Sequence, residues 1–154
     1  MADITNDTQL QQAIEKDIQI AIDRTIIRLL EELQKQIETV VYDAGDPVRY
    51  QRTKQFLNMW KGNPSVIMGD TVVGEISPDY GILKTNKNKH QHNITGEALV
   101  NLIIQGVGNK DMWYSAPRDF WDEFEDYVDR NIDKIFTEEM GKVQGNSTLF
   151  VNFG

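Results

Sequence analysis

The first 41 residues contain an apolar stripe at helical spacing, and its length constrains the fold more than any other feature. Apolar side chains recur at every third or fourth position, which is typical of one face of an α-helix: Leu10, Ile14, Ile18, Ala21, Ile22, Ile26, Leu29, Leu30, Leu33, Ile37, Val40 and Val41. One helix from about 8 to 42 would be roughly 50 Å long, whereas a compact domain of this size is only about 40 Å across. The helix therefore either breaks, near residues 23–25, or projects, and a projecting apolar stripe needs a partner surface.

The next elements are short. Gly45 can end the first helix in a left-handed conformation, and Asp46 with Pro47 can start a short helical segment. Runs of β-branched residues flank Gly69 and Asp70, which predicts an antiparallel hairpin at about 64–77. The segment 84–93 is polar and predicts an exposed loop.

Two more helices follow. Thr95 can cap a short helix that stops at Gly106. A long last helix is predicted to start near Pro117 and to end at Gly141, with one apolar face formed by Phe120, Trp121, Phe124, Val128, Ile132, Ile135, Phe136 and Met140. We expect Phe120, Phe124, Val128 and Ile132 to pack against the hairpin and the first helix.

This order of elements indicates an α+β fold, with the long N-terminal and C-terminal helices packed on a small antiparallel sheet. Residues 1–154 are expected to form a single domain, with an extended tail at 141–154 that includes a β-prone stretch from Thr148 to Phe153.

Composition excludes several classes of site. The chain has no cysteine, so it has no disulfide, thiolate metal site or cysteine nucleophile. No apolar run approaches about 18 residues, and no export signal is recognisable. We therefore expect a soluble protein that does not associate with membranes.

The net charge of −8 is unevenly distributed. Residues 1–46 contain ten acidic and four basic side chains, 47–117 contain five and eight, and 118–154 contain nine and four. Strong nucleic-acid binding favours a basic domain, so this balance argues against it. A basic middle and acidic ends suit contacts between copies of the chain, or simply solvated helix faces.

Catalytic signals are weak. His90 and His92 could share a metal if they lie on a strand, but a zinc site needs a third ligand, and the chain has no other histidine. The glycines around 106–110 lack the pattern of a phosphate loop. The acids at 122–129 fit the solvated face of an amphipathic helix. We therefore expect that the protein is not an enzyme and binds no cofactor and no metal. The alternative, from another functional class, is a small metal-dependent hydrolase that uses His90 and His92.

The basic and aromatic residues of the segment Val40 to Gly62 indicate a protein interface rather than a nucleic-acid site. Arginine, tyrosine and tryptophan are favoured at protein interfaces, although they can also stack on nucleic-acid bases. We assign the candidate interface residues as Arg49, Tyr50, Arg52, Trp60, Trp113 and Tyr114. Arg49 and Arg52 would meet carboxylates, either on the same chain, at Asp122 or Asp126, or on the next copy.

The motifs, taken in order, resemble a known family. "VVYD" followed by "DPVRYQRTKQFLNMW", then "TGEALVNLIIQGVG" and "APRDFWDEFEDYVDRNIDKIF", are similar to the neck, or tail-component, proteins of long-tailed bacteriophages, which are head–tail connectors. The resemblance covers roughly residues 10–140. Lys54 stands where the family usually has glycine, and Asp119 where it usually has a second proline.

The resemblance implies a structural protein of the virion neck, assembled in the host bacterial cytoplasm. Such a protein forms a ring of about six or twelve copies, contacts head-completion or adaptor proteins and tail-terminator proteins, and continues the DNA channel without binding DNA specifically. A tail terminator or tail completion protein on the same fold is the alternative.

Overall fold

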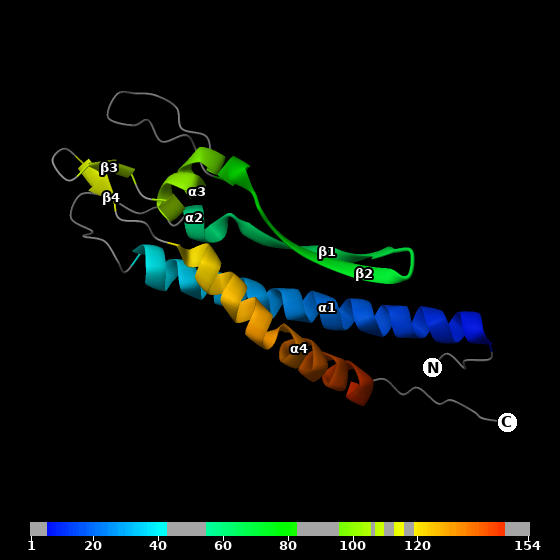
Figure 1. The fold of residues 1–154 in the computed structure, drawn as a ribbon. Coiled ribbons are helices and arrows are strands. Elements are labelled where there is room, and N and C mark those ends of the chain that lie inside the picture. The colour runs from blue at the N-terminus through cyan, green and yellow to red at the C-terminus, as the bar shows by residue number, and fades with distance from the viewer. Residues whose placement is uncertain are drawn as a thin grey trace.

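The computed structural model describes residues 6–42, 55–82, 96–105, 107–109, 113–115 and 119–146. The elements in order are the helix α1 (Asp7–Ile37), a π-helical turn (Glu38–Tyr42), α2 (Gln55–Asn58), β1 (Trp60–Met68), β2 (Thr71–Pro78), a 3-10 turn (Tyr80–Ile82), α3 (Gly96–Gln105), β3 (Val107–Asn109), β4 (Trp113–Ser115) and α4 (Phe120–Asn146). Two long helices and an antiparallel hairpin confirm the α+β class (Figure 1).

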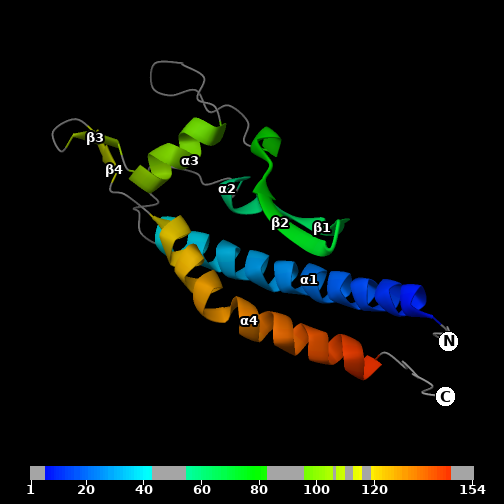
Figure 2. The ribbon, with the colours of Figure 1, turned by 45° about the vertical axis from the view of Figure 1, so that its right-hand side comes forward.

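Helix α1 is continuous, so the break considered near residues 23–25 is absent. Asn6 caps its start, with the Gln9 amide donating to Asn6 Oδ1 at 2.9 Å, and the buried Thr25 donates its hydroxyl to the Ala21 carbonyl at 2.8 Å. The helix has 31 residues, which makes it about 46 Å long. It does not project alone, because the hairpin and α4 both run along it (Figures 1 and 2).

Strands β1 and β2 form the predicted hairpin. They pair antiparallel from Trp60 opposite Pro78 to Met68 opposite Thr71, with a register shift between Asn63 and Val66. The turn contains Gly69 at φ +67°, a left-handed conformation that glycine adopts without the steric cost other residues meet. A second two-stranded sheet joins β3 and β4.

Two glycines let the hairpin lie directly on α1. A Cβ atom at Gly74 would lie 2.6 Å from Ile22 Cγ2 and 2.9 Å from Ile26 Cγ1, and one at Gly62 would lie 2.6 Å from Ile26 Cγ2. The strand backbone therefore packs against isoleucine side chains. Between these contacts the buried Ser65 donates its amide to Asp23 Oδ1 at 2.7 Å and its hydroxyl to the Gln19 carbonyl at 3.3 Å.

Helix α4 begins beside the predicted start and ends later than predicted. Asp119 caps it, accepting a hydrogen bond from the Asp122 amide at 3.0 Å. The predicted end at Gly141 is wrong, because the helix continues to Asn146. Glycine in a helix costs only about 1 kcal/mol, and the buried Val143 anchors the last turns. Residues 141–146, predicted as part of an extended tail, are therefore helical. Residues 147–154 lie outside the described residues.

The core confirms part of the predicted packing. Phe120 and Phe124 are buried in a cluster with residues of α1, α2 and β1, and Val128 packs against that cluster. Ile132 differs: it is 39% exposed, because at that point α4 faces a hollow beside α1 rather than the core.

An ionic bridge joins α1 to α4. Arg28 Nη1 donates to Glu138 Oε2 at 2.9 Å and to Glu139 Oε1 at 3.1 Å. Lys142 Nζ reaches the same Glu139 oxygen at 3.0 Å. The Glu139 side chain is 5% exposed, so its two cationic partners compensate a carboxylate that is largely removed from solvent.

The glycine contacts predict opposite effects for one substitution at two positions. Gly74→Ala should lower the free energy of unfolding by about 1–3 kcal/mol, the usual cost of overpacking, because the new methyl meets Ile22 and Ile26. Gly141→Ala should raise it by about 0.5–1 kcal/mol, because a Cβ there would meet no other segment of the described chain within 4 Å. Denaturant titration measures both, and an unchanged Gly74→Ala midpoint would contradict the close packing.

The ionic bridge predicts a pH-dependent stability. The pKa of Glu139 is lowered, mainly by the hydrogen bond from Lys142 and further by Arg28, while burial opposes the shift. The stabilisation is therefore fully present above the ordinary pKa of about 4.5 and is lost as the pH falls through the lower folded-state pKa. Glu139→Gln should lower the melting temperature at pH 7, and its difference from the unmodified protein should shrink below about pH 4.5. Glu123→Gln on the exposed face of α4 is the control, and a difference that persists undiminished at low pH would argue against the bridge.

Candidate functional site

The predicted interface residues have separate locations. Arg49, Tyr50 and Arg52 lie outside the described residues. Trp113 and Tyr114 lie in β4, where Trp113 is opposite Asn109 and Tyr114 opposite Gly108 of β3. Trp60 opens β1 and is 6% exposed, within the core. The described residues thus leave the arginine hypothesis untested and place Trp60 inside its own chain.

Trp60 belongs to an aromatic cluster where α2, β1 and the start of α4 meet. Its ring stacks on Trp121 with centroids 5.5 Å apart and meets Phe120 edge-on at 5.9 Å. Phe120 in turn meets Phe56 edge-on at 5.3 Å, and Trp121 lies 5.6 Å from Phe124. Trp60 Nε1 is buried with no hydrogen-bond partner among the described residues, so packing is the main contribution of this side chain.

We call residues 43–54, which contain Arg49 and Arg52, the basic segment. The residues on both sides of this segment pack in the same core as the aromatic cluster. Val41, which precedes residues 43–54, and Phe56, which follows them, are both buried and belong to that core. Leu57 next to Phe56 is buried as well. The arginines therefore lie in a segment whose two flanks are attached to the core.

The acids of α4 form a solvated face, as predicted. All five are exposed: Asp122, Glu123, Glu125, Asp126 and Asp129. Asp126 accepts from Arg130 at 3.1 Å, and Glu125 accepts from the Trp121 indole at 2.5 Å. The neighbouring Asp119 carboxyl raises the pKa of Asp122. Asp122 and Glu123 lie in the first turn of α4, where the helix dipole stabilises a negative charge.

Among the described residues, no three metal-ligating side chains gather into a group; His90 and His92 lie outside them. In the same part of the chain, no helix has the length and apolar character needed to cross a bilayer.

The outer face of the hairpin is a first exposed surface. Gly74 and its strand neighbours at alternate positions face α1, so the intervening residues point away from it. Near the turn this outer face is apolar, with Val66 opposite Val73, exposed by 52% and 39%, and Met68 exposed by 63%. Towards the base it is polar, since Asn63 Nδ2 donates to Glu75 Oε2 and Ser77 Oγ, both at 2.9 Å. We call Val66, Met68 and Val73 the hairpin patch.

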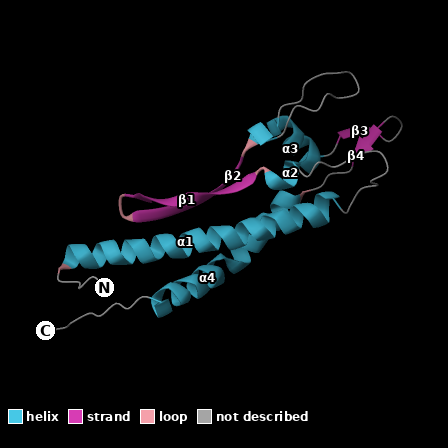
Figure 3. Cartoon of the chain, turned by 180° about the vertical axis from the view of Figure 1, so that it is seen from behind, coloured by secondary structure: helices cyan, strands magenta, loops and turns pink. Residues whose placement is uncertain are grey.

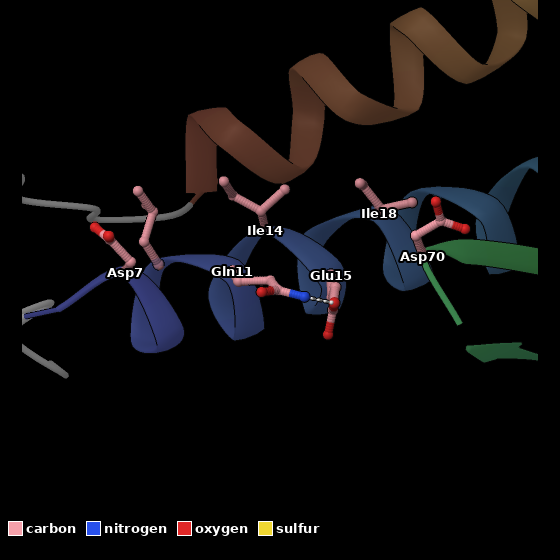
Figure 4. Close-up of a pocket in the computed structure, with 7 residues that line it drawn as sticks. Asp7, Gln11, Ile14, Glu15, Ile18 and Asp70 are labelled. Atoms are coloured by element: carbon pink, nitrogen blue, oxygen red, sulfur yellow. Dashed lines mark hydrogen bonds between the residues drawn. The ribbon is translucent and has the colours of Figure 1, made fainter. Parts of the chain in front are cut away.

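A groove along α1 is the second exposed surface. It consists of two hollows of about 390 Å³ and 330 Å³. The first is lined by Asp7, Leu10, Gln11, Ile14, Glu15, Ile18 and Asp70 (Figure 4). The second is lined by Ile22, Thr25, Ile26, Leu29, Gly74, Ile132, Asp133 and Phe136. Ile18 and Ile22 are one helical turn apart on the same face of α1, so the hollows follow one another along the helix.

The sequence contained a signal for both surfaces. The apolar stripe of α1 was expected to need a partner, and its N-terminal part lines the groove. The hairpin tip has consecutive apolar residues in the sequence on both sides of Gly69 and Asp70. Consecutive apolar residues place apolar side chains on both faces of a strand, and they do not indicate which face another element covers.

Together these features define the class of the protein: an elongated α+β protein, built on one long helix, with apolar surfaces exposed on the hairpin and along that helix. A family model described as YomN matches residues 6–142, so the chain belongs to the YomN family. That family is named after a gene of the SPbeta phage region of Bacillus, which makes this a phage-associated protein. Neither the curated proteins nor the solved structures contain a match.

The aromatic cluster predicts a large loss of stability when one ring is removed. Phe124 is 5% exposed, so Phe124→Ala should cost about 3–5 kcal/mol of unfolding free energy. Ile27→Ala, at a site 56% exposed on α1, should change it by about 0.5 kcal/mol or less. Chemical denaturation compares the two, and equal small effects would mean that α4 does not pack in the core as described.

Proposed function

We propose that this protein is a structural component of the phage particle that forms a ring with copies of itself in the neck, between head and tail. Membership of a phage-associated family supports the viral setting. The resemblance of the ordered motifs to phage neck proteins favours the connector position over a tail terminator. The proposal assigns the protein no catalysis.

The observation that supports self-assembly is the hairpin patch. Val66, Met68 and Val73 are all exposed. Val66 and Val73 lie opposite each other, and such an apolar cross-strand pair is suited to a sheet face that another surface covers. Exposed apolar patches of this kind mark interaction surfaces.

A closed ring requires two unlike faces on each copy. The hairpin patch is one. The side of α1 that bears Ile27 is the other, since Ile27 is 56% exposed and its neighbours Arg24 and Glu31 are exposed as well. Apolar contact supplies the affinity, while the charged neighbours fix the orientation of the two copies.

The basic segment adds specificity in this proposal. Arg49 and Arg52 would pair with carboxylates of an adjoining copy, and Tyr50, Trp113 and Tyr114 would contribute aromatic contacts. An exposed ion pair is worth at most about 1 kcal/mol, so the arginines orient the ring more than they stabilise it. Adjacent head-side adaptor and tail-terminator proteins would bind the two rims of the ring.

The acidic surface suits a DNA channel. With a net charge of −8, the ring repels the phosphate backbone. DNA would pass through without specific binding.

The hairpin patch predicts the behaviour of a charged variant. Val66→Asp with Val73→Asp should abolish the ring with only a small loss of stability, because both side chains already face solvent and the repulsion between the two opposite carboxylates costs about 0.2–1 kcal/mol. Native mass spectrometry and negative-stain electron microscopy measure the assembly, and complementation of a phage deletion measures the joining of heads to tails.

Asn58→Asp with Gln144→Asp is the matched control, since it also adds two negative charges at exposed positions and should preserve assembly. Rings formed equally well by the Val66 and Val73 variant would remove the hairpin patch from the interface. An unmodified protein that stays monomeric, together with normal particles from the deletion strain, would overturn the proposed function.

A further inference from the structure

The groove along α1 has an apolar floor and two different walls. Leu10, Ile14, Ile18, Ile22 and Ile26 of α1 line the two hollows, with Ile14 46% exposed. Ile132 and Phe136 of α4 form one wall, and Asp70 and Gly74 at the hairpin form the other. The surface left open is therefore the continuation of the same apolar stripe that packs in the core farther along α1.

Strand β2 borders the groove with an edge to which no described strand is paired. Gly74 of β2 lines the hollow together with Ile132 and Phe136 of α4, so β2 is the hairpin strand nearer to α4. Among the described residues β2 pairs only with β1. An extended segment in the groove could therefore hydrogen-bond to β2 as a third strand while its side chains cover the isoleucines of α1.

The rim of the groove restricts the charge of the occupant. Asp7, Glu15, Asp70 and Asp133 line the hollows, and no lysine or arginine is among the lining residues. An acidic occupant would be repelled. A suitable occupant is apolar, β-prone and free of carboxylate side chains.

The residues that follow α4 in the sequence fit this description. Residues 147–154 read "STLFVNFG", with Leu149, Phe150, Val151 and Phe153 as apolar side chains and no charged side chain. β-branched and aromatic residues of this kind favour strands.

Position and length also agree. Helix α4 ends at Asn146, alongside the N-terminal half of α1 and short of its first turn (Figures 1 and 3). Eight extended residues span about 26 Å, and the stretch of α1 from Leu10 to Ile26 is about 24 Å long. The segment is therefore long enough to lie along the part of α1 from Ile14 to Ile22, which is about 12 Å long.

We propose that residues 147–154 of the same chain occupy the groove as a third strand beside β2, with their apolar side chains on Ile14, Ile18 and Ile22. This docking covers the exposed part of the α1 stripe within one subunit. It does not depend on the proposed ring, because the groove and the segment belong to one chain.

Disulfide trapping tests the proposal directly, because the chain has no cysteine of its own. Ile18→Cys is combined in turn with Leu149→Cys, Phe150→Cys and Val151→Cys in the full chain, and each variant is oxidised at several protein concentrations. The expected product is an intramolecular disulfide in at least one pair, at a rate independent of concentration, read by intact mass and peptide mapping.

Ile27→Cys with the same three partners is the matched control, since Ile27 is exposed on a different side of α1. It should form no intramolecular disulfide. Equal trapping at Ile18 and Ile27, the absence of trapping at Ile18, or a covalent dimer that depends on concentration would each overturn the proposal. The dimer would identify a second copy as the source of the segment.

A second measurement avoids cysteine. Replacing Leu149, Phe150, Val151 and Phe153 by serine should uncover the groove, giving a several-fold rise in binding of an apolar fluorescent dye and a lower melting temperature. Adding Ile18→Ser to that variant should lower the melting temperature less than Ile18→Ser lowers it in the unmodified chain. Purely additive effects would show that segment and groove do not touch.

Discussion

The apolar stripe of α1 is the constraint on which the rest of the structure depends. A stripe that runs the full length of a 31-residue helix cannot be covered by a compact core, so the hairpin and α4 are both extended along it. Gly62 and Gly74 allow the hairpin backbone to approach Ile22 and Ile26, and Arg28 ties α4 to the other side through Glu138 and Glu139.

The two ends of the molecule are covered to different degrees. At one end the aromatic residues of α2, β1 and α4 fill a core around Leu33 and Ile37. At the other end, of the described residues only those of the hairpin turn and the last turns of α4 lie near α1 (Figure 2), and Ile14, Val66 and Met68 are exposed. Part of the exposed apolar surface therefore lies where the layers are thinnest, at the hairpin patch and at the N-terminal end of the groove.

Several elements could be predicted from local pattern. The long helix, the hairpin turn at Gly69 and Asp70 and the burial of Phe120 and Phe124 follow from periodicity and turn chemistry, which act over a few residues. The end of α4 could not be predicted in this way. Gly141 is a good local stop signal, but the buried Val143 beyond it outweighs the small cost of glycine within a helix.

The sequence by itself determined the elements, the α+β class and the need of the α1 stripe for a partner, because periodicity states which face of a helix is apolar. Only the tertiary structure decided that Trp60 is inside, that Ile132 faces a hollow, and that β2 is the strand beside the groove. Each of these depends on contacts between residues far apart in the sequence, such as Trp60 with Trp121, and no local pattern records which of several apolar faces another element covers.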